Sequence, residues 1–545
     1  MALLSLSIPR IALCVVSIFF LVLVGVSSET LEDHVIKQCG FTRYPSLCAQ
    51  TLQNDRSLLH PNDFLDALVN RTISEMGLPD SNFEILSYHF ISPEAQHARA
   101  AMDYCHELMG MAVKRLNQVR EALRRSPENH KADVQTWLSA ALTFQDTCKD
   151  SVEGHVPSNV YMAEIYRRMG YLSELGSNPL ALANRIASVQ ESPAAATAGT
   201  GRRVLGLGGE DEFPAWVSGK DRKLLQSGAA PLIRANAVVA KDGSGNFKTV
   251  AEAIAAARGS RFVIYVKAGT YNEKINTNKD GITLIGDGKY ATVITASGSV
   301  AKGSNLRGTA TFTITGDGFI ARDIGFHNTA GSAAEQAVAL TVASDHAVFY
   351  RCSIAGYQDT LYALSLRQFY RECDIHGTVD FIFGNAAAVF QSCNLVLRRP
   401  PGGGSYNVIL ANGRTDPGQN TGFSIHNCRI AVASDYSPVK NSVKSFLGRP
   451  WKEYSRAVVM QSNIDGAVAA RGWVEWPGAG GSIYKSLYFA EYGNMGAGGG
   501  TSGRVRWPGF HVMAAEEAAR FSVGDFIGGN MWLPSTGVTF VSGLQ

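Results

Sequence analysis

Two aspartates of this 545-residue chain recur at equivalent places in two similar segments. Asp359 lies seven residues after Cys352, and Asp380 lies seven residues after Cys373, so the two carboxyls are separated by the same interval as the two cysteines. If the two segments are successive coils of a repeat, the carboxyls face each other, and one keeps its proton while the other ionises. The spacing therefore predicts a general acid beside a base or nucleophile. The alternative is that each aspartate only caps a turn.

Amide side chains lie near the same aspartates. Gln358 directly precedes Asp359, and Gln336 precedes it by slightly more than the interval between the two aspartates, close to one coil back. Two carboxamides beside a carboxylate nucleophile can hold a developing oxyanion, an interaction of about 3–4 kcal/mol per donor in acyl transfer. Either glutamine could instead be a buried amide that bridges two coils.

The segment LGRPW adds a cation and an indole. Arg449 can hold an ionised aspartate with two parallel hydrogen bonds, and Trp451 offers a flat surface to a sugar ring. Alone, the segment could equally be a structural loop. The histidines are scattered and no third carboxylate is spaced for calcium, so we expect no metal and no cofactor. The sequence also has no Gly-x-Ser-x-Gly elbow, which argues against a serine hydrolase.

The elements that must position these residues are short, β-rich and repeated after Pro231. Cys352, Cys373 and Cys393 recur at nearly equal intervals, and two-residue hairpin turns are missing, so a parallel β-helix is favoured. Coils stack about 4.8 Å apart. That spacing predicts a disulfide between Cys373 and Cys393, which needs Cα atoms roughly 4.4–6.8 Å apart. Cys352 and Cys428 could equally be small core residues.

Residues from about Leu31 to Val189 have apolar side chains at helical spacing. One stripe begins at Met102 and a second at Val134, which predicts an antiparallel helical bundle. Cys39 and Cys48 are close in sequence, and Cys105 and Cys148 could join the two striped helices. Small residues then form a linker, followed by a candidate protease site at Arg222-Lys223, although paired basic residues can also be solvated surface.

The N-terminus and the composition indicate the compartment and the kind of partner. The apolar run 11–26 is short for a membrane span, so a signal peptide is favoured over an uncleaved anchor. Asn70 begins the glycosylation acceptor Asn-Arg-Thr. With 45% hydrophobic residues, disorder is excluded for most of the chain. The part after Leu225 has 29 basic and 22 acidic residues, a net charge of +7, and the part before it has a net charge of −4. A polyanion, either a nucleic acid or an acidic polysaccharide, fits the basic part.

Five ordered segments carry a resemblance to a known family. They are GTYNE (269–273), QAVAL (336–340), GYQDTLY (356–362), DFIFG (380–384) and LGRPW (447–451). These segments resemble the signature segments of plant pectin methylesterases, and the N-terminal part resembles the inhibitor-like pro-domain that precedes the enzyme in many members.

The resemblance implies an all-β right-handed parallel β-helix preceded by an all-α four-helix bundle. It implies a signal peptide at 1–28, a pro-domain at 29–190, a linker at 191–230 and the enzyme at 231–545. The implied substrate is methyl-esterified homogalacturonan in the cell wall, not nucleic acid, and the implied processing enzyme is a subtilisin-like protease. Position 306, where relatives often have a threonine that contacts sugar, is leucine.

The same resemblance assigns a role to each candidate residue. Asp380 would be the nucleophile, Asp359 the general acid and then base, and Gln358 and Gln336 the oxyanion donors. Arg449 would hold Asp380, and Trp451 would line the cleft. A glycoside hydrolase acting on the same polymer is the alternative, because β-helices with paired carboxylates also suit glycoside cleavage. A third possibility is that the bundle is an interaction module with its own function.

Overall fold

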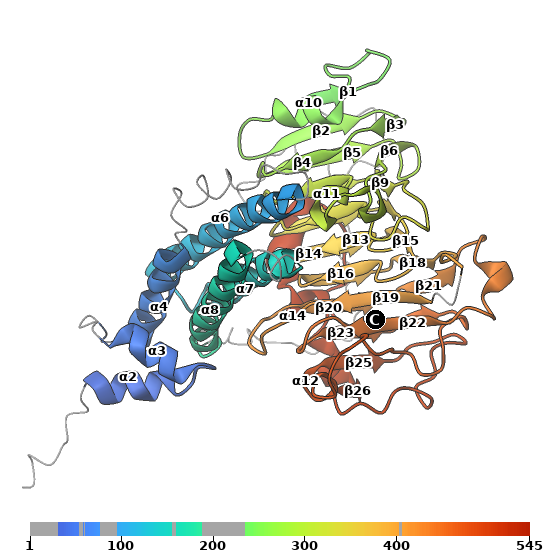
Figure 1. Ribbon diagram of the computed structural model, residues 1–545. Helices are drawn as coiled ribbons and strands as arrows, with labels where there is room; N and C mark the ends of the chain where they lie inside the picture. The colour runs from blue at the N-terminus through green and yellow to red at the C-terminus, as the bar shows by residue number, and fades with distance from the viewer. Residues whose placement is uncertain are drawn as a thin grey trace, which may run out of the picture.

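The protein has a helical N-terminal part and a strand-rich C-terminal part. The computed structural model describes residues 31–53, 58, 60–76, 95–154, 160–187, 235–402 and 406–545. Figure 1 shows the helices lying along one side of a stack of strands. The predicted signal peptide and the whole predicted linker (191–230), including Arg222-Lys223, lie outside these residues. Within the described ranges, no helix has the length and apolar character needed to cross a membrane.

The predicted apolar stripes form the core of the helical part. Its helices are α2 (Leu31–Cys39), α3 (Pro45–Leu52), α4 (Pro61–Met76), α6 (Ala95–Arg125), α7 (Lys131–Glu153) and α8 (Val160–Ala183). Met102 of α6 and Val134 and Leu138 of α7 are fully buried. Disulfides join Cys39 to Cys48 and Cys105 to Cys148, so both suggested pairings are confirmed. The second bridge fixes α6 against α7.

The strands form three parallel sheets that run side by side. The first sheet contains β1 (Ala237–Val239), β2 (Phe262–Val266), β5 (Ile282–Gly286), β8 (Ile320–Arg322), β11 (Ala347–Tyr350), β14 (Arg367–Arg371), β17 (Ala387–Gln391), β20 (Gly422–His426), β23 (Arg456–Met460), β25 (Tyr488–Tyr492) and β26 (Phe510–Val512). The second contains β3 (Gly269–Asn272), β6 (Thr292–Ala296), β9 (Gly325–Asn328), β12 (Ser353–Ala355), β15 (Asp374–Gly377), β18 (Asn394–Leu397), β21 (Arg429–Val432) and β24 (Asn463–Ile464). The third contains β4 (Ile275–Thr277), β7 (Phe312–Ile314), β10 (Leu340–Val342), β13 (Leu361–Ala363), β16 (Ile382–Gly384), β19 (Asn407–Asn412) and β22 (Ser445–Pro450).

From β2 to β22 each coil contributes one strand to each sheet, and the register follows the period seen in the sequence. Ser353 of β12 pairs with Asp374 of β15, and Leu361 of β13 pairs with Ile382 of β16, in both cases at the interval that separates the two aspartates. The predicted parallel β-helix is therefore confirmed. The interior is filled by side chains of successive coils; the rings of Phe349 and Tyr370, for example, stack at 4.9 Å.

Short helices surround the β-helix. They are α10 (Val250–Ala255), η3 (Val300–Lys302), α11 (Leu306–Thr309), η4 (Ser437–Val439), α12 (Ile483–Ser486), α13 (Ala515–Ala519), α14 (Val523–Phe526), α15 (Gly529–Trp532) and η5 (Leu533–Thr536). The carboxylate of Glu273, the last residue of GTYNE, accepts hydrogen bonds from the first two N–H groups of α10, at 2.9 Å each. This signature segment therefore caps a helix at one end of the stack.

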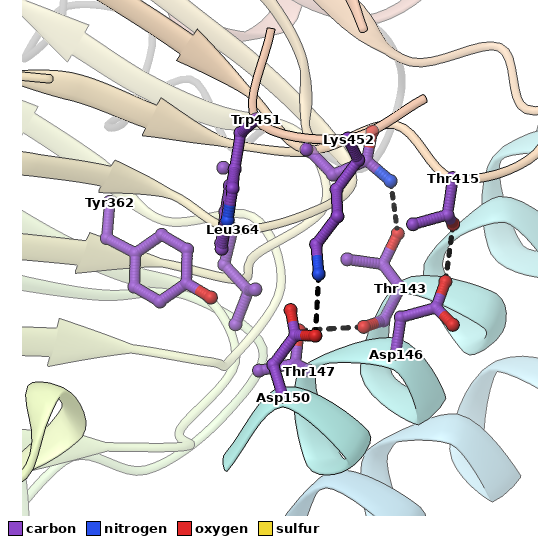
Figure 2. Close-up of a pocket in the computed structure, with 12 residues that line it drawn as sticks. Thr143, Asp146, Thr147, Asp150, Tyr362, Leu364, Thr415, Trp451 and Lys452 are labelled. Atoms are coloured by element: carbon purple, nitrogen blue, oxygen red, sulfur yellow. Dashed lines mark hydrogen bonds and ion pairs between the residues drawn. The ribbon is translucent and has the colours of Figure 1, made fainter. Parts of the chain in front are cut away.

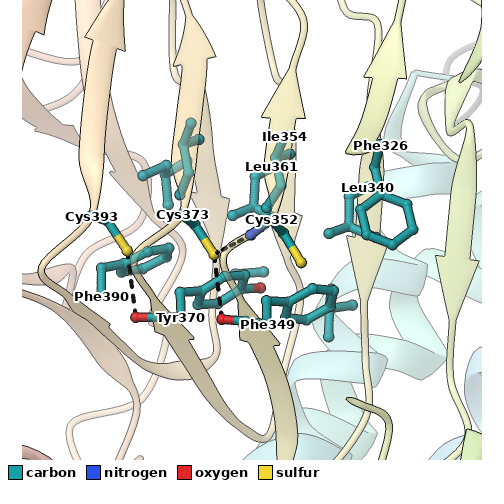
Figure 3. Packing of buried hydrophobic residues seen from close by; sticks show 14 of the residues in the cluster. Phe326, Leu340, Phe349, Cys352, Ile354, Leu361, Tyr370, Cys373, Phe390 and Cys393 are labelled. Atoms are coloured by element: carbon teal, nitrogen blue, oxygen red, sulfur yellow. Dashed lines mark hydrogen bonds between the residues drawn. The ribbon is translucent and has the colours of Figure 1, made fainter. Parts of the chain in front are cut away.

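The cysteines of the β-helix form a row of buried thiols, so the predicted Cys373–Cys393 disulfide is wrong. Figure 3 shows Cys352, Cys373 and Cys393 side by side on consecutive coils. Parallel side chains on stacked coils are about 4.8 Å apart, whereas a disulfide needs Cβ atoms about 3.5–4.5 Å apart. The thiols instead contact backbone groups, as where Cys373 Sγ donates to the carbonyl oxygen of Phe349 at 3.3 Å.

We predict that alkylation of the unfolded, unreduced protein labels Cys352, Cys373, Cys393 and Cys428, because these thiols are free but inaccessible in the folded state. Peptide mass spectrometry before and after unfolding measures this. The disulfide-bonded cysteines of the helical part serve as the unlabelled control. A peptide pair joined through Cys373 and Cys393 would contradict the structure.

Candidate active site

The two aspartates occupy equivalent positions on consecutive coils, as predicted. Asp359 lies two residues before Leu361 and Asp380 two residues before Ile382, and these two strand residues are paired. Both aspartates have a left-handed backbone, with φ of 58° and 49°, a conformation that aspartate tolerates better than most residues. The N–H of Asp359 donates to the carbonyl of Val379 at 3.0 Å, which ties one turn to the next.

Arg449 of β22 holds Asp380 from two coils further along the stack. Its Nε donates to both carboxylate oxygens of Asp380, at 2.9 and 3.1 Å, and a second guanidinium nitrogen also reaches Oδ2. The guanidinium further donates to the hydroxyl of Tyr406 at 3.1 Å and lies 4.4 Å from the ring centre of Trp476. Because the fork is held on several sides, it fixes the orientation of the Asp380 carboxylate.

The environment divides the two carboxyls into an acid and a base. Burial and the neighbouring charge of Asp380 raise the pKa of Asp359 well above its usual range. Burial also raises the pKa of Asp380, but the charge and hydrogen bonds of Arg449 oppose that rise. Asp359 is therefore the carboxyl that keeps the shared proton, and Asp380 is the one that ionises.

Gln358 and Gln336 lie on the turns beside this pair. The two turns are adjacent, because the N–H of Ala337 donates to the carbonyl of Gln358 at 3.2 Å. Both glutamine side chains are half-buried, and within the described residues neither carboxamide has a hydrogen-bond partner. Their N–H groups are therefore available to a bound ligand.

Aromatic rings line the outer face of the third sheet next to the carboxyls. The rings of Tyr362 and Phe383 stack at 4.3 Å, Trp451 lies 6.2 Å from Phe383, and Trp476 lies 6.4 Å from Trp451. The sequence interpretation assigned no role to Tyr406 or Trp476. The position of Trp476 can be found by counting coils. Gly448 of β22 pairs with Trp473 on the next turn, and Trp476 follows Trp473 in the sequence.

The helical part lies directly over this aromatic surface. Figure 2 shows residues of α7 facing Tyr362, Trp451 and Lys452 across a small pocket. Lys452 Nζ contacts Asp150 Oδ1 at 2.6 Å, and Asn385 Nδ2 donates to Thr143 Oγ1 at 2.9 Å.

Polar groups and ion pairs extend this contact along the third sheet. Arg115 of α6 donates to both oxygens of Asp317 at 2.7 Å, and Trp137 of α7 donates to Asp345 at 3.0 Å. Leu306 packs beside the hydrophobic cluster shared by the two parts.

Two predicted modification sites are not tested by these contacts. Asn70 lies within α4, where its amide donates to Asp66 at 3.1 Å, and its glycosylation stays a prediction. The cut at Arg222-Lys223 also stays a prediction, because those residues lie outside the described ranges.

The fold is a parallel β-helix that carries a pair of buried carboxyls, one of them held by an arginine, an arrangement that suits a hydrolase acting through carboxyl groups. Residues 236–530 match the family model described as pectinesterase, and residues 34–182 match the model for plant invertase/pectin methylesterase inhibitor. The chain belongs to the pectinesterase family and carries an inhibitor-type helical domain before the enzyme.

Individual relatives support this assignment. The chain is 46% identical over 518 residues to "Probable pectinesterase/pectinesterase inhibitor 54" of Arabidopsis thaliana, covering 92% of each chain. It is 49% identical to "Pectinesterase 2" of Citrus sinensis, covering 82% of this chain and 83% of the relative. The solved pectin methylesterase from carrot is 52% identical, with a TM-score of 0.56; the match covers 57% of this chain and 98% of the carrot chain.

These comparisons decide between the enzyme classes considered from the sequence. The chain is a pectin methylesterase by family, and the alternative of a glycoside hydrolase finds no support. The carrot chain is matched almost completely by little more than half of this chain, so much of the remainder of this chain has no counterpart in it.

Arg449→Lys is expected to lower kcat by about 10- to 100-fold, because a point charge replaces the fork and loses a charged hydrogen bond of about 1.5–3 kcal/mol. The acidic limb of kcat/KM should also move to higher pH. The cation favours ionised Asp380, so a weaker hold raises the pKa of that carboxyl and the nucleophile is lost earlier on acidification. Methanol release measured against pH tests both effects.

The matched control is Arg429→Lys, since Arg429 is exposed on β21 and has no charged partner among the described residues. An unchanged kcat and an unchanged acidic limb in Arg449→Lys would contradict the role given to the guanidinium.

Proposed function

We propose that the chain removes methyl groups from homogalacturonan through a covalent intermediate on Asp380. Ionised Asp380 attacks the ester carbonyl carbon, and the carboxamides of Gln358 and Gln336 donate to the oxyanion that forms. Protonated Asp359 gives its proton to the departing methanol, which leaves an acyl anhydride between the galacturonate and Asp380.

The second half of the reaction returns the enzyme to its starting state. Asp359, now ionised, takes a proton from water, and the hydroxide adds to the anhydride and releases galacturonic acid, which loses its proton to solvent and becomes the free carboxylate. Asp380 leaves as a carboxylate, and Asp359 is protonated again. The observation that carries this proposal is the contact of Arg449 with only one of two adjacent buried carboxyls, which assigns the proton to the other.

The aromatic surface beside the carboxyls suits a polysaccharide. Trp451, Trp476 and Phe383 present flat apolar faces that can stack on sugar rings. The net charge of +7 after Leu225 attracts an anionic polymer. Both features support retention on the anionic polymer of the cell wall, and the predicted signal peptide supports secretion to it.

We further propose that the helical part is a pro-domain that keeps the cleft closed. The position of α7 over Tyr362, Trp451 and Lys452 supports this, because a pectin chain needs the same surface. Cleavage at Arg222-Lys223 by a subtilisin-like protease would release the enzyme. This role also differs from that of a free-standing interaction module, since the contacts are made within one chain.

Asp380→Asn is expected to abolish methanol release, because an amide cannot attack the ester, while the fold stays intact. Methanol is measured on esterified pectin together with new reducing ends, and thermal unfolding checks the fold. Asp525→Asn, at an exposed position of α14 outside the site, is the control substitution. Retained methanol release in a folded Asp380→Asn variant would remove this residue from the role of nucleophile.

We expect methanol release to rise about tenfold or more when the chain is cut within residues 188–234 and the parts are separated at high salt. In the uncut protein the helical part covers the cleft in most molecules, so few clefts are open to pectin. Salt screens the charged contacts that hold α7. Uncut protein at the same salt is the control. Equal activity before and after separation would contradict the masking role.

A further inference from the structure

Two cations beside the cleft have acidic partners only in the helical part. Lys452 pairs with Asp150 of α7 at 2.6 Å, and Arg307 of α11 pairs with Glu107 of α6. Among the described residues, neither cation forms an ion pair with a carboxylate of the strand-rich part. Once the helices leave, both side chains lose their counterions.

Another cation at the same interface behaves differently. Arg367 contacts Asp133 of α7 at 2.7 Å, but it also pairs with Asp345 of its own β-helix at 2.7 Å. Arg367 therefore keeps a partner when the helices leave. Arg307 and Lys452 differ from Arg367 because, among the described residues, no carboxylate of the β-helix pairs with them. Arg367 can be explained as a cation that stabilises the β-helix itself.

The positions of the two cations bracket the reacting carboxyls. Arg307 precedes β7, and only β10 lies between β7 and β13, which follows Asp359. Lys452 follows β22, and only β19 lies between β22 and β16, which follows Asp380. The strands next to which the two cations stand are therefore each about two strand spacings, roughly 10 Å along the stack, from the strands that follow the reacting aspartates, and they lie on opposite sides of them. A polymer crossing the third sheet meets one cation before the reacting ester and the other after it.

Two carboxylates of the helical part, Glu107 and Asp150, pair with these cations. Glu107 lies two residues after Cys105, and Asp150 lies two residues after Cys148, and the two cysteines are bonded to each other. The bridge makes the two carboxylates a rigid pair. An aromatic ring accompanies each cation: Arg307 lies 5.1 Å from the ring centre of Tyr104, and Lys452 lies 5.5 Å from that of Trp451.

We propose that Arg307 and Lys452 are subsites for free galacturonate carboxylates on either side of the ester under attack. A partly de-esterified chain carries such carboxylates at intervals, and each forms a charge-assisted hydrogen bond with one cation. The helical part occupies these subsites with Glu107 and Asp150, in the manner of a product-like chain. The released enzyme therefore favours chains that already contain free carboxylates and extends de-esterified stretches. This inference rests on the proposed function.

The test uses the enzyme released by cutting within residues 188–234 and separated at high salt, then returned to low salt. Kinetics are measured on two homogalacturonans of equal length, one fully and one partly methyl-esterified. The unmodified enzyme should have a lower KM on the partly esterified chain. Arg307→Gln and Lys452→Gln should each reduce this KM advantage about threefold or more, and the double variant should remove it. Arg307→Lys and Lys452→Arg, which keep the charges, should retain most of it.

The matched control is Lys248→Gln, which removes the same charge from an exposed lysine beside α10, at one end of the β-helix. It should leave the KM advantage unchanged. An equal loss in this control would assign the preference to net charge and overturn the proposal, as would an unmodified enzyme without the preference. Unchanged preference in both glutamine variants would overturn it too.

The test separates this inference from the proposed masking and chemistry. Failure of the unmodified enzyme to release methanol would contradict the catalytic assignment, whereas methanol release without the charge-dependent preference would contradict only the subsites. The thermal midpoint shows whether a glutamine variant is folded. If one is not, Arg307→Lys and Lys452→Arg decide the question. Loss of the KM advantage in both of these variants, with the fold intact, would overturn the proposal.

Discussion

The stacking of coils at a single strand spacing is the constraint on which the active site depends. Asp359 and Asp380 occupy the same place on consecutive coils, so the backbone hydrogen bonds between those coils bring their carboxyls together. A regular sheet fixes this spacing more firmly than a loop would. The energetic cost of burying two like charges is then resolved by unequal protonation. Arg449, fixed on the same scaffold two coils away, decides which carboxyl ionises.

The same scaffold explains how one surface serves two partners. The outer face of the third sheet is aromatic, and beside it stand Arg307 and Lys452, which have no acidic partner among the described residues of the β-helix. We expect this surface to suit an anionic sugar polymer as well as an acidic helical surface. The helical part meets it with Asp150 on Lys452 and with hydrogen bonds such as Thr143 to Asn385. The ion pair is partly accessible and the hydrogen bond is buried, and around them apolar side chains of both parts share one cluster. Under the proposed masking role, cutting the linker removes the high local concentration that holds the two parts together.

Repetition made much of the fold and site predictable from sequence. The intervals between Cys352, Cys373 and Cys393 revealed the period of the coils, and the same intervals placed Asp359 beside Asp380. The row of cysteines misled in one respect, because spacing along the stack does not reveal that parallel Cβ vectors disfavour a bridge. Counting coils gives the place of Trp476 but not its role, because no equivalent indole recurs on other coils. The docking of α7 depends on side chains distant in sequence, so it left no periodic signal.

Infrared difference spectroscopy near neutral pH tests the unequal sharing of the proton most directly, because a protonated carboxyl and a carboxylate absorb at different frequencies. We predict a buried protonated-carboxyl band in the enzyme that disappears in Asp359→Asn and persists in Arg429→Lys. The account would be contradicted if the unmodified enzyme had no such band. It would also be contradicted if the band were lost in Asp380→Asn but kept in Asp359→Asn.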